Sequence, residues 1–237
     1  MSAIYKRELK DYFTSPLGYI FLAVYLISYG LLFSELYAVG VPQTAMIFSN
    51  LSFITVFLIP VLTMRLFSEE RRQKTDRALL TAPVSLTGIV MGKYLAALTV
   101  FGLSQVVTLI YQTIFAFNVT VDWVGYLSCL VGTMLMAAAL IAVGLFISSL
   151  TDSQIVAAVV SMALSAFLMF LIDFVATKIQ IEWLSWIPSV LQWLSFQGRY
   201  YTYLTSIFDI ANTVYFISFS AVFIFLTVRV QESKRWA

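Results

Sequence analysis

The sequence predicts an all-α integral membrane protein with six transmembrane helices, formed by residues 1–237 as a single domain. Hydrophobic residues make up 61% of the chain and charged residues 11%, with a mean hydropathy of +0.92. A soluble domain carries roughly a quarter charged residues. Six apolar runs are also long enough to cross the bilayer, which takes about 20 residues of helix. Both observations favour a membrane-embedded helical bundle.

The six predicted spans cover residues 17–36, 45–67, 94–117, 123–150, 154–176 and 211–230. Pro60 should kink the second span without ending it, because neighbouring helices can satisfy the freed carbonyl. Only a few residues separate the fourth span from the fifth, which predicts a tight antiparallel hairpin. Small residues such as Gly132 and Gly144 favour close helix approach in the fourth span.

Basic residues predict the orientation of the bundle. Twelve of the fourteen lysines and arginines fall on one side of the predicted spans, and only Lys178 and Arg199 fall on the other. By the positive-inside rule, both termini and the polar loop between the second and third spans are cytoplasmic, as expected for a multi-pass protein of the inner membrane. The opening residues carry charges of both signs and no small-residue cleavage site, so we expect no cleavable signal peptide.

Two further segments are expected to lie at the membrane surface. Residues 3–14 should form an amphipathic helix in the cytoplasmic interface, ended by Ser15-Pro16. Residues 177–210 form an outward connection rich in aromatic residues, which favours interfacial or re-entrant helices, with Gly198 interrupting one of them. The apolar stripe of the first helix consists of Tyr5, Leu9, Tyr12 and Phe13.

The polar loop of residues 68–92 is the most informative segment for function. Ser68 is a plausible N-cap, with Glu69 and Glu70 favoured in the first turn of a short helix. Ser85 should cap the segment that leads into the third span. The basic residues of the loop have two interpretations: they only enforce topology and contact anionic headgroups, or they contact a soluble partner.

The loop resembles the coupling region of type-2 ABC exporter permeases, the ABC-2 family of membrane subunits. The opening KRELKDYFTSPLGY is similar to the elbow helix of that family, and the last span and its ending are similar to permeases of the gliding-motility type. Two residues depart from the usual pattern: Lys74 stands where the family usually has glycine, and Arg77 where it usually has glutamate. The matching positions are Glu69-Glu70, Thr75, Leu79-Leu80, Pro83-Val84-Ser85, Ile89-Val90 and Gly92-Lys93.

This resemblance implies a permease subunit of an ATP-driven exporter that docks a separate ABC ATPase. It implies that ATP and Mg²⁺ bind the partner ATPase, that this chain binds no cofactor or nucleic acid, and that a second permease copy or a related permease completes the transporter. The first and fifth spans would form the permease contact. The implied ATPase-coupling residues are Glu69, Glu70, Arg71, Arg72, Thr75, Asp76, Leu79, Leu80 and Pro83.

Other function classes fit the residues less well. The chain has no Walker A sequence and no histidine, so we predict neither ATP hydrolysis by this chain, nor a catalytic residue, nor a metal site. An intramembrane CAAX-type protease would need an EExxxR motif and histidines, but Glu69-Glu70 is followed by Lys74. An ion-coupled secondary transporter, which would need more intramembrane charges, and a non-transporting membrane scaffold remain the alternatives. The sequence does not predict the substrate.

Polar residues within the spans have two interpretations. Gln105, Thr108 and Gln112 share one face of the third span, and Asp173 lies near the outer end of the fifth. They could line a substrate path, as ionisable and polar groups at membrane depth often do. They could also form interhelical hydrogen bonds or, for Asp173, a paired or hydrated structural site.

Overall fold

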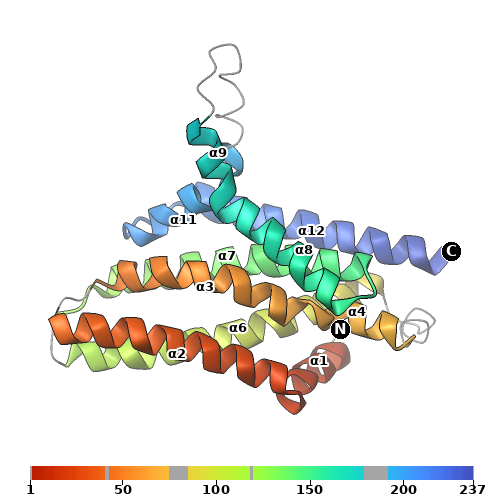
Figure 1. The fold of residues 1–237 in the computed structure, drawn as a ribbon, viewed down its shortest axis with the longest axis horizontal. Helices are drawn as coiled ribbons and strands as arrows, with labels where there is room; N and C mark the ends of the chain where they lie inside the picture. Colours follow the sequence, from red (N-terminus) through yellow and green to blue (C-terminus); the bar gives the residue numbers. More distant parts are fainter. Residues whose placement is uncertain (1, 41–42, 75–84, 118–119, 179–191, 237) are drawn as a thin grey trace, which may run out of the picture.

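The structure is a computed structural model that describes residues 2–40, 43–74, 85–117, 120–178 and 192–236. All regular elements in the described residues are helical. Figure 1 shows them along the chain as α1 (Ser2–Thr14), α2 (Pro16–Val39), α3 (Thr44–Thr63), α4 (Arg65–Arg72), α6 (Leu86–Ala116), α7 (Trp123–Leu150), α8 (Gln154–Ala166), the π-helical turn η1 (Phe167–Leu171), α9 (Ile172–Lys178), α11 (Phe196–Leu204) and α12 (Ile210–Trp236).

The predicted fold class is confirmed. In the described residues, six helical segments are long and apolar enough to cross a membrane: α2, α3 together with α4, α6, α7, α8 continued through most of α9, and α12. Figure 1 shows α2, α3, α6, α7 and α12 running along the long axis of the molecule, while α8 crosses them obliquely. The fourth and fifth spans form the tight antiparallel hairpin, since α8 begins four residues after α7 ends and packs against it.

Helix α7 lies at the centre of the bundle and packs against α3, α6, α8, α11 and α12. Two glycines make this possible, as the small residues predict. A Cβ at Gly144 would lie 2.1 Å from Thr63 Oγ1 on α3, and a Cβ at Gly132 would lie 2.5 Å from Tyr203 Cβ on α11. Both helices approach α7 more closely than any side chain would allow, which supplies close packing where hydrophobic driving force between helices is weak.

Helix α6 begins earlier than the predicted span. Residues 86–92, expected in the loop, form its first turns, so Lys93 lies inside the helix. Ser85 is the N-cap that the sequence predicts, because its Oγ accepts a hydrogen bond from the backbone N–H of Gly88 at 3.3 Å. The short polar stretch that separates the second and third apolar runs is therefore partly helical.

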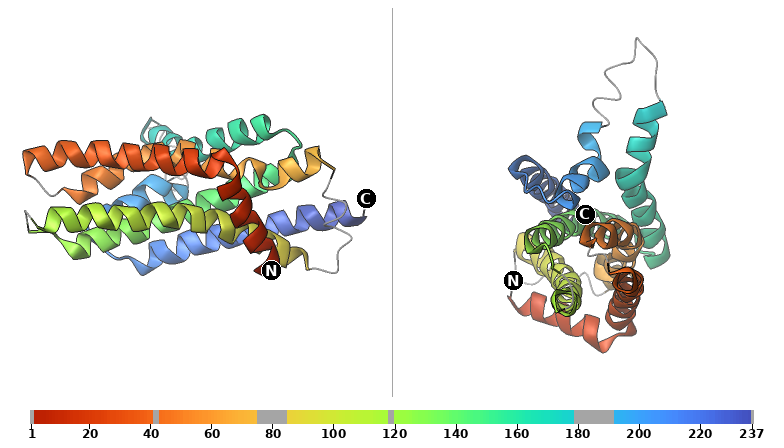
Figure 2. Two further views of the ribbon diagram at one scale, coloured as in Figure 1. Left: turned by 90° about the horizontal axis from the view of Figure 1, so that it is seen from below. Right: turned by 90° about the vertical axis from the view of Figure 1, so that its left-hand side faces the viewer.

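Helix α1 covers the residues for which an amphipathic helix is predicted, and it packs on the protein itself. It lies across α6 and against the start of α2 (Figure 2). Tyr5 forms a 3.0 Å hydrogen bond with Thr99 Oγ1 on α6, and the buried Tyr12 hydroxyl donates to the carbonyl of Leu62 at 2.8 Å. Pro16 then occupies the first turn of α2, where its missing N–H costs nothing.

The opposite end of the bundle carries α9 and α11. Asp173 accepts a 2.6 Å hydrogen bond from Ser195, the N-cap of α11. The expectation that Gly198 interrupts a helix is wrong: Gly198 lies in the first turn of α11, and its N–H donates to Ser195 Oγ at 3.2 Å. A glycine in a first turn leaves the helix intact because the cap satisfies its amide. Residues 179–191 lie outside the described residues.

Candidate functional site: a charge network at the basic end

One end of the bundle collects nearly all the positive charge, and we call it the basic end. It is formed by α1, α4, the start of α6, the α7–α8 turn and the end of α12. All lysines and arginines of the described residues lie there except Lys178 and Arg199. Both chain termini point toward this end (Figures 1 and 2). The described structure therefore places together the residues that the sequence assigns to one side of the membrane.

Lys93 is the centre of a buried charge network at the basic end. Its side chain is 1% exposed, and its Nζ lies 2.8 Å from Glu8 Oε1 on α1 and 3.0 Å from Glu70 Oε1 on α4. The same Nζ donates to the carbonyl of Leu66 at 2.6 Å. An ammonium group has three protons to donate, so these contacts satisfy it fully. One side chain thus joins α1, α4 and α6.

Arg7 balances the charge of the two glutamates. Its Nη2 lies 2.8 Å from Glu8 Oε1 and 2.5 Å from Glu70 Oε1. Burial disfavours the ionised form of Glu8, but attraction to Lys93 and hydrogen bonds from Arg7 and Lys93 outweigh it and lower the pKa of Glu8 below its usual 4.5. Two cations thus face two anions, which is the pairing that makes a buried charge tolerable.

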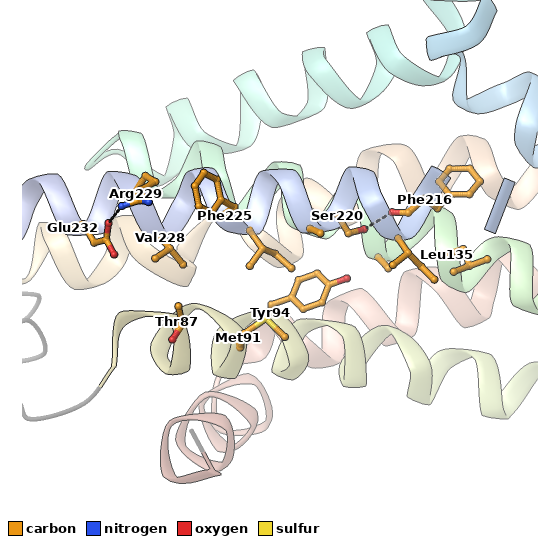
Figure 3. A pocket seen from close by; sticks show the side chains of 14 residues that line it. Thr87, Met91, Tyr94, Leu135, Phe216, Ser220, Phe225, Val228, Arg229 and Glu232 are labelled. Atoms are coloured by element: carbon orange, nitrogen blue, oxygen red, sulfur yellow. Dashed lines mark hydrogen bonds and ion pairs between the residues drawn. The ribbon is translucent and has the colours of Figure 1, made fainter. Parts of the chain in front are cut away.

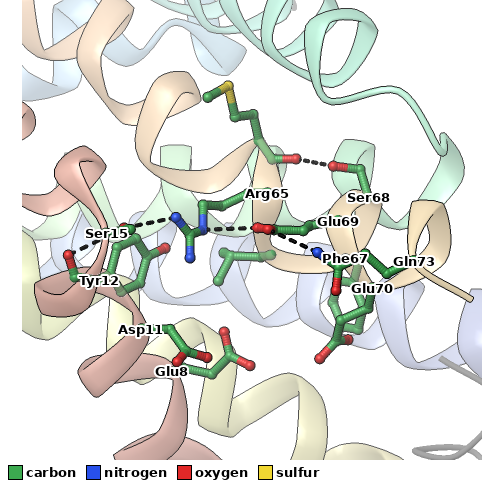
Figure 4. A network of polar contacts seen from close by, with 12 residues as sticks. Glu8, Asp11, Tyr12, Ser15, Arg65, Phe67, Ser68, Glu69, Glu70 and Gln73 are labelled. Atoms are coloured by element: carbon green, nitrogen blue, oxygen red, sulfur yellow. Dashed lines mark hydrogen bonds and ion pairs between the residues drawn. The ribbon is translucent and has the colours of Figure 1, made fainter. Parts of the chain in front are cut away.

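Arg65 and Glu69 extend the network to the α1–α2 junction (Figure 4). Arg65 Nε lies 3.2 Å from Glu69 Oε2, and its Nη1 donates to Ser15 Oγ at 2.8 Å, at the break between α1 and α2. Gln73 donates to Glu69 at 3.3 Å. A polar cleft of about 410 Å³ lies between α1 and α4, lined by Arg7, Glu8, Asp11, Arg65, Leu66, Glu69, Glu70, Gln73 and Lys93.

On its other side, α4 is tied to the α7–α8 turn. Arg71 Nε lies 2.7 Å from Asp152 Oδ1, and its Nη1 donates to the carbonyl of Ser149 at 3.3 Å. Lys234, near the end of α12, donates to the same carbonyl. Helix α4 is therefore connected to α1, α6 and the α7–α8 turn at once, whereas Arg72 and Lys74 at its end are exposed.

A serine from α7 fills the junction between α3 and α4. The hydroxyl of Ser148 accepts from the backbone N–H groups of Phe67 and Ser68 at 3.1 and 3.2 Å, and it donates to the carbonyl of Met64 at 3.0 Å. The expectation that Ser68 is an N-cap is wrong: Ser68 is buried inside α4, and its own hydroxyl also donates to Met64. Because α4 follows α3 with only Met64 between them, no open helix start exists at Ser68.

The structure divides the predicted coupling residues into three groups. Glu69, Glu70 and Arg71 are engaged in the ion pairs above, and Arg72 is exposed. The remaining coupling residues lie outside the described residues: Thr75, Asp76, Leu79, Leu80 and Pro83.

The apolar stripe of α1 packs inward, with Leu9 and Phe13 against the core beside Tyr5 and Tyr12.

Sequence reasoning missed the roles of Glu8, Lys93 and Ser148. A signal for Glu8 was present, because Glu8 lies three residues after Tyr5 and four before Tyr12 and so shares their face of the helix. A signal for Lys93 was also present, since a lone charge among apolar residues of a membrane helix needs a partner. Nothing in the sequence indicates that Ser148 meets α4.

The predicted pathway residues all have partners on other elements. Gln105 donates to the Tyr25 hydroxyl at 2.6 Å, and Thr108 bonds the Tyr126 hydroxyl at 2.9 Å. Asp173 pairs with Ser195, as described above. Gln112 Nε2 likewise donates to Thr44 Oγ1 at 3.3 Å. These contacts agree with the interhelical interpretation; a substrate path along these residues stays a prediction.

Comparison with known families agrees with this architecture. A family model described as ABC-2 type transporter matches residues 1–196. A search of the curated proteins found no match. The matched residues include α1, α4 and the ion pairs around Lys93, together with the first five of the six membrane-spanning segments. The chain therefore belongs to the ABC-2 type transporter family and is a multi-pass membrane component of a transport system.

Proposed function

We propose that this chain is the permease subunit of an ATP-driven exporter, with both termini on the cytoplasmic side of the inner membrane. Its ATPase is a separate subunit that holds ATP and Mg²⁺ and docks at the exposed end of α4 and the residues that follow. A second permease copy, or a related permease, completes the transporter. Family membership supports the class of function, and the charge at the basic end supports the orientation.

The network around Lys93 is the observation that carries the coupling proposal. Helix α4 lies next to the proposed docking residues, and the ion pair of Glu70 with buried Lys93 connects it to α6, which spans the membrane. A force applied at Arg72 or Lys74 would reach Lys93 through Glu70. Because α1 is bound to the same lysine, α1, α4 and the start of α6 would move as one unit.

The two kinds of charge in this region have different energetic roles. Exposed ion pairs contribute only about 0–1 kcal/mol each, so exposed Arg72 and Lys74 would make docking specific and reversible. Breaking a buried pair costs about 3–5 kcal/mol because it leaves an uncompensated charge. The link from α4 to α6 would therefore persist while the ATPase binds and releases.

The test is a double charge reversal, Arg72→Glu with Lys74→Glu. A matched control is Lys6→Glu with Lys10→Glu, which reverses two exposed charges on α1 at the same end of the bundle. We expect the first variant to lose copurifying ATPase and ATP hydrolysis in proteoliposomes, while the control retains both. Equal ATPase retention by the two variants, with normal membrane insertion of each, would contradict docking at the end of α4.

A further inference from the structure

Three helices enclose an apolar groove on the side of the bundle away from α4. Its volume is about 560 Å³, which is within the usual range for small-molecule sites. Helices α6 and α12 form its walls, and Tyr94 points from α6 toward α12 (Figure 3). Leu135 and Ala138 of α7 complete the lining. The α12 wall lies beyond residue 196, where the family match ends.

The charged groups of the groove gather at the basic end. Figure 3 shows Thr87, Arg229 and Glu232 at one end, while the remainder of the lining is apolar apart from the hydroxyls of Tyr94 and Ser220. Thr87 and Glu232 also line a second pocket, which adds Ser85 and Arg235. The apolar groove therefore adjoins a charged pocket where α6 begins and α12 ends.

The charged end carries a net positive charge. Arg229 Nη1 lies 2.8 Å from Glu232 Oε2, and the Arg229 side chain is 63% exposed. Arg235, which is exposed, lies three residues after Glu232 on α12 and lines the second pocket with it. The charged end thus has two guanidinium groups and one carboxylate. An apolar groove that opens at such an end is complementary to an amphiphile with an acyl chain and an anionic head.

We propose that this groove binds an anionic phospholipid, with an acyl chain between α6 and α12 and the phosphate against Arg229 and Arg235. The head group must provide the selectivity, because an acyl chain gains little by leaving other lipid chains for an apolar groove. Basic residues near the membrane surface attract anionic head groups. This groove is separate from the proposed ATPase contact, so lipid binding there does not depend on that contact.

A second permease copy is the competing occupant of the groove. The predicted permease contact uses the first and fifth spans, α2 and α8, and both expose apolar faces for it. Ile27 and Leu31 on α2 are 62% and 63% exposed, and Ile155 and Val159 on α8 are 77% and 60% exposed. The groove lies on α6 and α12 instead, which leaves it open to lipid when that contact forms.

Native mass spectrometry of the full-length chain, released from nanodiscs of mixed phosphatidylglycerol and phosphatidylcholine, tests the proposal. We expect preferential retention of phosphatidylglycerol. Arg229→Gln and Arg235→Gln should each lower the ratio of retained phosphatidylglycerol to phosphatidylcholine about fivefold, from the usual effect of one surface cation. Glu232→Gln should raise that ratio, because it removes the carboxylate that repels phosphate.

Filling the groove with a larger side chain provides an independent test of the proposal. Ala221→Phe places a ring in the groove and should abolish retention of both lipids, whereas Val222→Phe, on the exposed neighbouring residue outside the groove, should not. Equal retention of the two lipids by the wild type, or equal behaviour of the two phenylalanine variants, would overturn the proposal. So would a change in the number of permease copies caused by Ala221→Phe alone. The arginine variants alter exposed side chains, so they remain informative if Ala221→Phe fails to fold.

Discussion

Lys93 and Glu8 form an ion pair of 2.8 Å although 85 residues separate them along the chain. Lys93 belongs to a membrane-spanning helix, and Glu8 belongs to the helix that precedes the first span. Lys93 also pairs with Glu70, and Glu8 also pairs with Arg7. The start of the chain, the short helix α4 and the third span are therefore held together by charge at a buried position.

Removing the central cation should destabilise the protein strongly. Lys93→Met leaves Glu8 and Glu70 without their buried partner, and we expect a loss of about 3 kcal/mol or more in the free energy of unfolding. The triple variant Lys93→Met, Glu8→Gln, Glu70→Gln should recover much of that loss because no buried charge remains unpaired. Denaturant titration in detergent micelles measures both values, and additive effects of the three substitutions would argue against a coupled network.

The network also predicts how stability depends on pH. The pKa of Glu8 is lowered in the folded protein, so its contribution to stability is fully present above the unfolded value of about 4.5 and is lost as the pH falls through the folded value. We expect the melting temperature to be insensitive to this group between pH 5 and pH 8 and to decrease below about pH 4.5. Glu8→Gln should make that decrease shallower. An identical acid profile for wild type and Glu8→Gln would show that the pair contributes nothing.

Ser148 and its neighbour Ser149 provide a matched pair at the α3–α4 junction. The hydroxyl of Ser148 bonds two backbone amides of α4 and the carbonyl of Met64 between α3 and α4, whereas the hydroxyl of Ser149 donates to the carbonyl of Phe146 in its own helix. Ser148→Ala should therefore cost about 1–3 kcal/mol of stability, because buried amides lose their partner. Ser149→Ala should cost well under 1 kcal/mol. Thermal unfolding of both variants checks this, and equal costs would mean that the junction does not depend on Ser148.

Lys74 adopts a backbone conformation that favours glycine. Its φ is +56°, in the left-handed region that costs a residue with a Cβ about 1–2 kcal/mol. Glycine, which the permeases that the loop resembles usually have at this position, adopts such a conformation without that cost. We expect Lys74→Gly to stabilise the protein by up to about 1 kcal/mol, while Lys74→Ala should not. A melting temperature that rises equally for both variants would attribute the effect to charge instead.

The fold could be predicted from the sequence because apolar runs and charge placement reflect the bilayer directly. Six spans and the collection of basic residues at one end follow from residue type alone. The site could be predicted only in part: Glu69, Glu70 and Arg71 were identified, but their partners were not. Lys93 and Glu8 meet only because α1 folds back across α6, and Ser148 meets α4 only because Gly144 lets α3 approach α7. Such contacts depend on packing between distant segments, which residue patterns do not encode locally.

Photo-crosslinking at the end of α4 tests the central claim most directly. A photoreactive amino acid is placed at Arg72, which is exposed at the basic end, or at Tyr201, which is 62% exposed on α11 at the opposite end. We predict that position 72 crosslinks, in native membranes, to a protein that binds ATP and contains a Walker A sequence, identified by mass spectrometry of the adduct. Position 201 should give no such adduct. Crosslinks to an ATP-binding protein from position 201 and none from position 72 would contradict the proposed docking site.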